Sequence, residues 1–366
     1  MTGLFDPLAF NRGPAMKNRF MLSPLTNCQS HDDGTLSDEE YRWLTMRAEG
    51  GFGVTMTCAS HVQAQGRGFP GQLGIFSDQH LPGLSRLAAA IRRAGSLAMV
   101  QLHHAGMRAP DALIGGQPVC PSRDAATGAR ALELAEVERL VEDFAAAALR
   151  AERAGFDGVE LHAAHGYLLA QFLSDETNRR EDRYGGSLEN RSRILFEILA
   201  AIRSRCRPDL TVGVRLSPER FGLRLPEMVE VAQRLIQAGM IDFLDLSLWD
   251  VFKEPADVEF QGRSLLSYFA SLDRGRVRMG AAGRISGSLD AARCLDAGLD
   301  FVIVGRAAIL HHDFPERVRA DPDFRSASLP VTAEYLGREG LGPAFIGYMG
   351  NWKGFVAPAP EAAAQA

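Results

Sequence analysis

The sequence is poor in cysteine and has no long uncharged apolar run. Its five cysteines are scattered over 366 residues, form no C-x-x-C pair and are odd in number, which disfavours a disulfide framework or a thiolate metal site. No stretch reaches the ~18 apolar residues of a membrane span, and the first residues lack the basic and apolar regions of a secretory signal. We therefore expect a cytoplasmic protein that does not insert into a membrane.

Signals for binding nucleic acids or nucleotides are also lacking. Lys and Arg total 40 against 45 Asp and Glu, giving a net charge of −5, so no basic excess points to a nucleic-acid partner. No G-x-x-x-x-G-K-[ST] motif occurs. The segment Gly66–Gly71 matches G-x-G-x-x-G, but Pro70 lies inside it and no helix pattern follows. It is therefore not interpreted as a dinucleotide-binding turn.

The sequence does contain a regular alternation of short apolar runs and longer helical patterns. Such an alternation predicts parallel strands joined by crossover helices, and eight such strands can close into a barrel. The expected strands are Arg19–Ser23, Gly53–Cys58, Ser96–Leu102, Phe156–His162, Thr211–Ser217, Phe243–Ser247, Val277–Ala281 and Phe301–Val304. The expected helices are Asp38–Ala48, Leu81–Arg93, Ala135–Ala154, Leu188–Arg205, Pro226–Ala238, Leu265–Leu272, Ser288–Ala297 and Pro315–Ala320.

We therefore predict an α/β fold consisting of a single (β/α)8 TIM barrel, with an open doubly wound sheet as the structural alternative. The segment Ala105–Leu134 is too long for an ordinary connection, so it predicts an insertion after the third strand that covers a site. Residues 1–357 are expected to form one domain with a C-terminal extension. The tail Pro358–Ala366 has nothing to bury and is expected to be frayed.

The fourth expected strand ends in three side chains that carry chemistry, His162, His165 and Tyr167. Catalytic groups of (β/α)8 barrels lie at the carboxyl ends of strands. Two neutral imidazoles can each offer an N–H to a carbonyl oxygen that gains negative charge during reduction, and a tyrosine can supply a proton. Metal binding is the rival interpretation, but the further ligands are not evident. Capping of backbone carbonyls is the structural alternative.

Such a reduction requires a flavin or nicotinamide, because no side chain delivers a hydride. Gly283-Arg284 and Gly305-Arg306 follow the last two expected strands, and each pair is expected to open onto a helix and bind a phosphate. Arg215 is expected to point into the barrel as an unpaired cation that needs an anionic or electron-rich partner. The polar strand ends Ser23–Thr26 and Gln101–His104 are expected to bond a flat heteroaromatic ring.

Together these residues resemble the old yellow enzyme family of FMN-dependent NAD(P)H oxidoreductases, from about Leu4 to Phe314. The longest matching block runs from Ala154-Gly155 through the two histidines and the tyrosine to Asn190-Arg191. Shorter matching segments are Leu4–Leu8, Lys17–Phe20, Ser23–Thr26 and Gln101–Gly106.

The resemblance implies a bound FMN that NADH or NADPH reduces and that a small electron-poor alkene reoxidises in the same pocket. It implies that His162 and His165 bind the substrate carbonyl and that Tyr167 protonates the α-carbon. The implied flavin contacts are Ser23, Pro24, Leu25, Thr26, Ala59, Gln101, Arg215, Gly283, Arg284, Gly305 and Arg306.

The walls of the substrate pocket are expected to include Cys28, Trp249 and Phe252, whereas Tyr348 and Trp352 fit either a pocket wall or packing on outer helices. No metal is expected. Alternative functions are an FMN barrel that dehydrogenates an amine or dihydropyrimidine, and a flavin-binding barrel without chemistry. Assembly into a homo-oligomer is left open.

Overall fold

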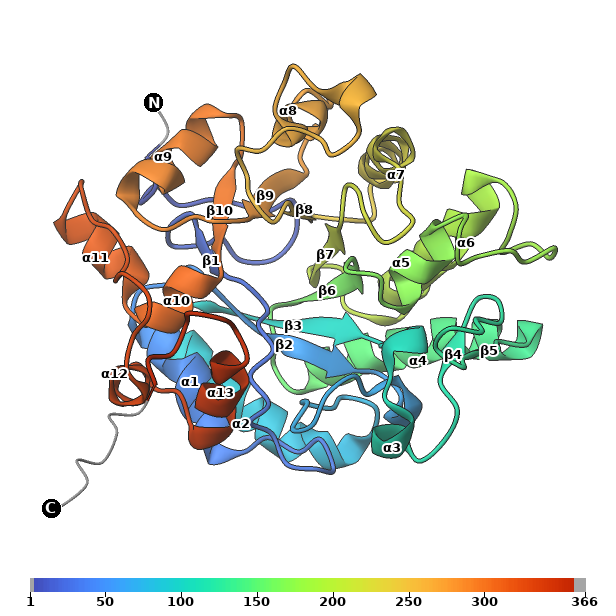
Figure 1. The fold of residues 1–366 in the computed structure, drawn as a ribbon, viewed down its shortest axis with the longest axis horizontal. Coiled ribbons are helices and arrows are strands. Elements are labelled where there is room, and N and C mark those ends of the chain that lie inside the picture. The colour runs from blue at the N-terminus through green and yellow to red at the C-terminus, as the bar shows by residue number, and fades with distance from the viewer. Residues whose placement is uncertain (1–2, 359–366) are drawn as a thin grey trace, which may run out of the picture.

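The structure is a computed structural model that describes residues 3–358, and its centre is a closed barrel of eight parallel strands in the order β1-β10-β9-β8-β7-β6-β3-β2. Figure 1 shows the helices arranged around these strands. The prediction of a (β/α)8 barrel is confirmed, and the open sheet is wrong. The barrel strands are Phe20–Leu22 (β1), Val54–His61 (β2), Leu97–His103 (β3), Gly158–Ala163 (β6), Thr211–Leu216 (β7), Phe243–Ser247 (β8), Arg278–Ala282 (β9) and Phe301–Val304 (β10).

The long helices agree with the predicted ones to within a residue or two at each end. Four of the helices end at an Ala-Gly pair whose glycine has left-handed backbone, as at Gly155 (φ 89°) and Gly239 (φ 64°). The outer helices are Asp38–Glu49 (α1), Leu81–Arg93 (α2), Leu134–Arg153 (α4), Leu188–Arg205 (α6), Leu225–Gln237 (α7), Leu265–Ala270 (α8), Ser288–Asp296 (α9) and Phe314–Ala320 (α11).

Three short helices near the carboxyl end of the barrel were not predicted. They lack the pattern of one apolar face and one polar face on which a helix prediction rests; every residue of Leu168–Leu173, for example, is buried. The three are Leu168–Leu173 (α5), Ala333–Arg338 (α12) and Pro343–Gly350 (α13), whereas Arg306–Leu310 (α10) is the helix onto which Gly305-Arg306 was expected to open.

The predicted insertion after the third barrel strand has structure of its own. It contains a short helix, Asp111–Ile114 (α3), and two two-residue strands, Val119–Cys120 (β4) and Arg130–Ala131 (β5), which pair in parallel. Its first turn brings Arg108 to the barrel mouth, where the guanidinium donates to the carbonyl of His165 and lies 4.7 Å from the Tyr167 ring centroid. The insertion therefore contacts the loop that carries the predicted catalytic residues.

The C-terminal extension folds back over the barrel beside α1 (Figure 1). The rings of Trp43 on α1 and Phe345 on α13 pack edge to face, with centroids 4.9 Å apart. The backbone N–H of Gly342, just before α13, donates to Gln29 Oε1 at 2.7 Å. These contacts hold α13 over the carboxyl ends of the first strands. The tail predicted to fray lies, apart from its first residue, outside the described residues.

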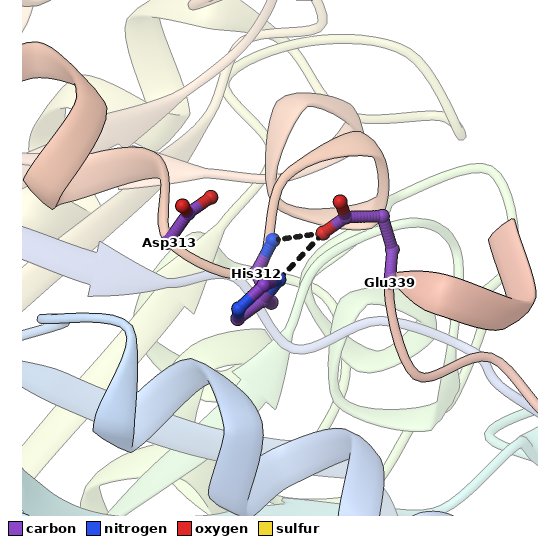
Figure 2. A group of neighbouring side chains, drawn as sticks. All are labelled: His312, Asp313 and Glu339. Atoms are coloured by element: carbon purple, nitrogen blue, oxygen red, sulfur yellow. Dashed lines mark hydrogen bonds and ion pairs between the residues drawn. The ribbon is translucent and has the colours of Figure 1, made fainter. Parts of the chain in front are cut away.

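A second attachment of the extension involves His312, which follows α10, and Glu339, which follows α12 (Figure 2). Glu339 Oε2 accepts hydrogen bonds from the backbone N–H and from Nδ1 of His312, both at 2.7 Å. Asp313 lies within 4.8 Å of both groups, but its carboxylate bonds Arg317 Nε at 2.7 Å. Because these oxygens already have partners, we interpret the group as a clip that fixes the extension.

The amino-terminal end of the barrel is closed by aromatic rings. The Phe10, Phe243 and Phe301 rings lie 5.5 to 6.3 Å from one another. Gly213 and Gly280 make room for two of them, since a Cβ at either position would lie 2.1 and 2.3 Å from the rings of Phe243 and Phe301, respectively. These rings fill the end of the barrel opposite the carboxyl end, where active sites of this fold lie.

Candidate active site

A cavity of about 230 Å³ lies at the carboxyl ends of the barrel strands. It gathers residues that are more than three hundred positions apart in the sequence, and most of them are residues that the sequence analysis had singled out. The lining residues are Ser23, Pro24, Leu25, Thr26, Ala59, Phe69, Gln101, His162, His165, Tyr167, Arg215, Arg306, Ile309, Tyr348, Met349 and Trp352.

A second cavity, of about 460 Å³, adjoins the first and shares four residues with it: Leu25, Arg215, Arg306 and Trp352. It is lined by both Gly-Arg pairs at the ends of β9 and β10. Both cavities together have the size of an ordinary cofactor site, about 300 to 1,000 Å³.

The two histidines at the end of β6 are hydrogen-bonded to each other. His162 Nε2 lies 3.2 Å from His165 Nδ1. The second nitrogen of each ring also has a hydrogen-bond partner. His162 Nδ1 accepts from the backbone N–H of Ala164 at 3.3 Å, and His165 Nε2 lies 2.6 Å from Ser247 Oγ. The expectation that both rings offer a free nitrogen to one point is therefore not met in this arrangement, in which the imidazoles bond each other.

These contacts fix where the ring protons lie. Because Nδ1 of His162 accepts, its proton is on Nε2 and is donated to His165 Nδ1; His165 then carries its proton on Nε2, facing Ser247. Burial lowers the pKa of His165 to about 3 and that of His162 well below its ordinary value, with the neighbouring positive charge of Arg215 acting in the same direction. Both imidazoles are thus neutral at pH 7, each with one N–H to give.

Tyr167 stands beside the histidine pair at the start of α5. Its ring meets those of His162 and His103 edge to face, with centroids 5.0 and 4.4 Å away. The location of its side chain follows from the tight turn that precedes it, in which His165 and Gly166 both have left-handed backbone (φ 58° and 67°). That turn reverses the chain, so that imidazole and phenol face the same cavity.

Arg215 on β7 has a partner that the sequence analysis missed. Its Nε lies 3.0 Å from Asp245 Oδ2 on β8, and the two residues are adjacent in the sheet register. The expectation of an unpaired buried cation is therefore wrong, because the neighbouring strand supplies a carboxylate. Gln101, which also lines the cavity, donates its Nε2–H to Glu160 Oε1 at 2.7 Å. Arg215 and Gln101 are thus each paired with a fully buried acidic residue.

The two Gly-Arg pairs differ from each other in structure. Gly305 directly precedes α10, as predicted, but α9 begins four residues after Arg284, so that the first pair does not open onto a helix. Gly283 is required where it stands: with φ at 156°, a Cβ there would lie 2.8 Å from the Asp250 backbone nitrogen. The two loops nevertheless line one cavity, and Arg306 reaches both cavities.

Of the three residues predicted to form walls of the substrate pocket, one lines a cavity and two do not. Trp249 lines the second cavity and is 63% exposed. Phe252 does not line a described cavity, and the guanidinium of Arg293 stacks on its ring at 3.9 Å. Cys28 also lies outside the cavity linings; burial raises the pKa of its thiol to about 11.

Tyr348 and Trp352, for which a pocket wall and packing on outer helices were both left open, line the cavity because α13 folds back over the barrel. The lining residues Phe69, Ile309 and Met349 were missed, because nothing in the local sequence marks them. Ser247 and Asp245 belong to one face of β8, two positions apart, and this spacing is the one signal that could have placed both inside the barrel.

The residues present suit FMN. Gly305 borders open space, since a Cβ there would meet nothing closer than 3.8 Å, and the adjoining Arg306 offers a guanidinium, the side chain best matched to phosphate. The outer guanidinium nitrogen of Arg215 has only long contacts, 3.4 and 3.5 Å, to Ser23 and Ser247. It therefore retains donors for the oxygen or nitrogen atoms of a flavin ring.

Comparison with known proteins agrees with this fit. Residues 3–322 match the family model described as the NADH:flavin oxidoreductase / NADH oxidase family. The chain is 35% identical over 327 residues to the probable NADH-dependent flavin oxidoreductase YqiG of Bacillus subtilis, covering 86% of this chain and 87% of that protein. It is 34% identical over 325 residues to an NADPH dehydrogenase of a Geobacillus species, covering 86% and 93%.

Some relatives are longer: the chain spans 36% of the length of an NADH:fumarate oxidoreductase of Klebsiella pneumoniae, with 32% identity over 333 residues. Among solved structures, the old yellow enzyme homologue from Zymomonas mobilis superposes with a TM-score of 0.79 at 29% identity, covering 92% of this chain and 96% of that one. Within the described residues, no helix is long and apolar enough to cross a membrane. The chain belongs to the NADH:flavin oxidoreductase / NADH oxidase family and is an FMN-dependent NAD(P)H oxidoreductase of the old yellow enzyme type.

Proposed function

We propose that the protein reduces the C=C bond of electron-poor alkenes, above all α,β-unsaturated carbonyl compounds. The observation that carries the proposal is the joint placement, in one cavity, of two neutral imidazoles, a phenol and the Arg215 and Gln101 side chains. Bound FMN supplies the hydride for the β-carbon of the alkene and takes it from NADH or NADPH. The protein's own residues bind the carbonyl oxygen and provide the proton.

His162 and His165 bind the carbonyl oxygen of the substrate. The oxygen replaces the hydrogen bond between the two rings and receives the N–H of His162 Nε2. For His165 to donate from Nδ1 as well, its Nε2 must instead accept from Ser247 Oγ, and a hydroxyl can serve as donor or acceptor. Ser247 thus allows the second imidazole to turn from acceptor into donor. Negative charge developing on the oxygen is then held by two N–H groups.

Tyr167 donates its hydroxyl proton to the α-carbon as hydride reaches the β-carbon. The balance is one hydride and one proton added across the C=C bond, with the carbonyl left intact. Tyr167 is only partly buried, so its phenol regains the proton from solvent. The guanidinium of Arg108, 4.7 Å from the ring centroid, holds the ring in place against His103.

We further propose that the two Gly-Arg loops bind the flavin phosphate and that the Ser23–Thr26 segment, Ala59, Gln101 and Arg215 contact the flavin ring system. Gly283 and Gly305 bring the backbone close, whereas Arg284 and Arg306 supply charge. Arg284 also pairs with Asp250 at 3.4 Å, so that Arg306, which has no carboxylate within ion-pair distance among the described residues, is the stronger phosphate ligand.

The test is product analysis under anaerobic turnover with 2-cyclohexenone and either NADH or NADPH. The proposal predicts cyclohexanone as product, one per nicotinamide oxidised, and no allylic alcohol. The Tyr167→Phe variant is a matched control, because it keeps the ring and removes only the proton source. Oxidation of NADH or NADPH without formation of cyclohexanone would overturn the proposal.

A further inference from the structure

Behind the proposed flavin contacts lies a fully buried cluster of four polar side chains: Gln101 on β3, Glu160 on β6, Arg215 on β7 and Asp245 on β8. They face the barrel interior, since the sheet register pairs Gln101 with Glu160 and Arg215 with Asp245. Gln101 and Arg215 line the cavity, whereas Glu160 and Asp245, their neighbours in the sheet register, do not line it. The proposed reaction assigns no role to these two acidic residues.

The hydrogen bonds of the cluster are incomplete if both acids are ionised. Gln101 satisfies Glu160 Oε1, but Glu160 Oε2 and both oxygens of Asp245 have no hydrogen-bond partner among the described residues. Arg215 Nε is 3.0 Å from Asp245 Oδ2, an ion-pair distance, but the two groups do not meet the geometry of a hydrogen bond. Buried carboxylate oxygens without donors are costly, and a proton on one of the two acids would supply a donor.

The charges lead to the same conclusion. Two carboxylates side by side out of water repel each other, and one guanidinium can balance only one of them. Burial raises the pKa of Glu160 well above its ordinary value, and the charge of Asp245 raises it further. Burial also raises the pKa of Asp245, to about 6, while Arg215 opposes that rise. Glu160 is therefore the protonated member, and Asp245 is the ionised partner of Arg215.

We propose that Glu160 and Asp245 hold a single proton between them and that this proton, by keeping the cluster neutral, sets the reduction potential of the bound FMN. With Glu160 neutral, the charge of Arg215 is balanced by Asp245, and the cluster adds no net charge beneath the flavin ring. A negative charge placed on the ring during reduction would be stabilised by a net positive cluster and destabilised by a net negative one. Glu160 and Asp245 are thus positioning residues that act through Arg215 and Gln101.

The proposal predicts a pattern of three variants that ordinary structural residues would not give. Glu160→Gln keeps the neutral charge of the native acid and should leave the potential unchanged. In Asp245→Asn, Arg215 loses its partner, so Glu160 gives up its proton and restores neutrality, again with little change. The double variant leaves Arg215 unbalanced and should raise the potential by at least the ~30 mV that a tenfold change in a two-electron equilibrium represents. The effects are strongly non-additive.

Two measurements test the pattern on the FMN-loaded protein, neither of which needs an alkene. Equilibration with a reference dye gives the flavin potential. Infrared difference spectra, wild type minus variant, isolate the C=O band of the protonated carboxyl in the cluster. The band should appear in the difference for Glu160→Gln and in the difference for Asp245→Asn, because each variant loses it. Glu40→Gln is the matched control: Glu40 is a buried carboxyl whose partners are Asn27 and Ser30, so its loss should leave the potential unchanged.

The proposal is overturned if Glu160→Gln alone raises the potential as much as the double variant does, because Glu160 would then be ionised. It is also overturned if the double variant leaves the potential unchanged. If that variant does not retain FMN, the infrared result decides. The shared proton is contradicted if the C=O band that Glu160→Gln removes is still present in Asp245→Asn. Failure of alkene reduction would leave all these outcomes unaffected, because they depend only on the bound flavin.

Discussion

Replacing His162 with alanine is the most informative single change at the site. His162 Nδ1 is occupied by the Ala164 N–H, so its Nε2–H is the one group that this ring can offer to a substrate oxygen. The variant removes that donor and also leaves His165 Nδ1 without its present partner. Loss of one preorganised oxyanion donor costs about 2.7 to 4 kcal/mol, or a factor of ~10² to 10³ in rate.

The assay is anaerobic stopped-flow reoxidation of the prereduced flavin by 2-cyclohexenone, read from the flavin absorbance. We expect the His162→Ala rate to fall by that factor while FMN stays bound, because the larger cavity with the Gly-Arg loops does not include His162. Phenols, whose phenolate oxygen resembles the developing enolate, should bind about ten- to a hundredfold more weakly, as expected for one lost hydrogen bond to a charged group.

Two controls separate the lost donor from general damage. His162→Asn retains an N–H and should lose less than the alanine variant. His104→Ala removes another buried imidazole, one that bonds Gln63 and Gly106 and does not line the cavity, so reoxidation should remain close to the wild-type rate. Reoxidation of His162→Ala at the wild-type rate, with full FMN occupancy, would refute the assignment of this histidine.

Three further predictions concern the proton, the pH dependence and the barrel floor. Tyr167→Phe should slow alkene reduction by about 10² to 10⁴-fold, the usual contribution of a general acid, while flavin reduction by NADH, measured separately, stays nearly unchanged. Burial holds the pKa of His165 at about 3, so the unfolded chain takes up a proton below pH ~6.5 that the folded protein does not. The free energy of unfolding should therefore decrease as the pH is lowered, by about 2 kcal/mol at pH 5 from this residue. Urea unfolding of the His165→Gln variant should lack that part of the decrease. Gly213→Ala places a Cβ 2.1 Å from the Phe243 ring and should destabilise the protein by about 1 to 3 kcal/mol. Gly337→Ala in α12, with no atom within 4 Å, should not destabilise it, and thermal unfolding of the two variants compares them.

The barrel was predictable because each β/α unit carries its own local pattern. Long amphipathic helices such as Leu188–Arg205, and buried apolar strands, can be predicted from their own sequence pattern without knowledge of their neighbours. The short helices at the barrel mouth do not. Residues Leu168–Leu173 are buried on all sides, and Pro343–Gly350 is fixed by contacts such as Trp43 with Phe345 rather than by its own pattern.

The site was predictable in composition more than in geometry. Strand ends identified His162, His165 and Tyr167 as a group, because a parallel barrel brings such ends together. Pairing across strands was not readable: the partnership of Arg215 with Asp245 depends on the register of β7 with β8, which no local pattern specifies. For the same reason, the hydrogen bond between the two imidazoles appeared only in the structure.

The central claim is that hydride held by the bound flavin passes to an electron-poor alkene in the cavity that contains His162, His165 and Tyr167. Its most direct test is a double-mixing experiment without oxygen, in which one equivalent of NADH or NADPH first bleaches the flavin and 2-cyclohexenone is then added. We predict full return of the oxidised flavin spectrum with one cyclohexanone formed per flavin. A flavin that bleaches but stays reduced in the presence of saturating cyclohexenone would contradict the account.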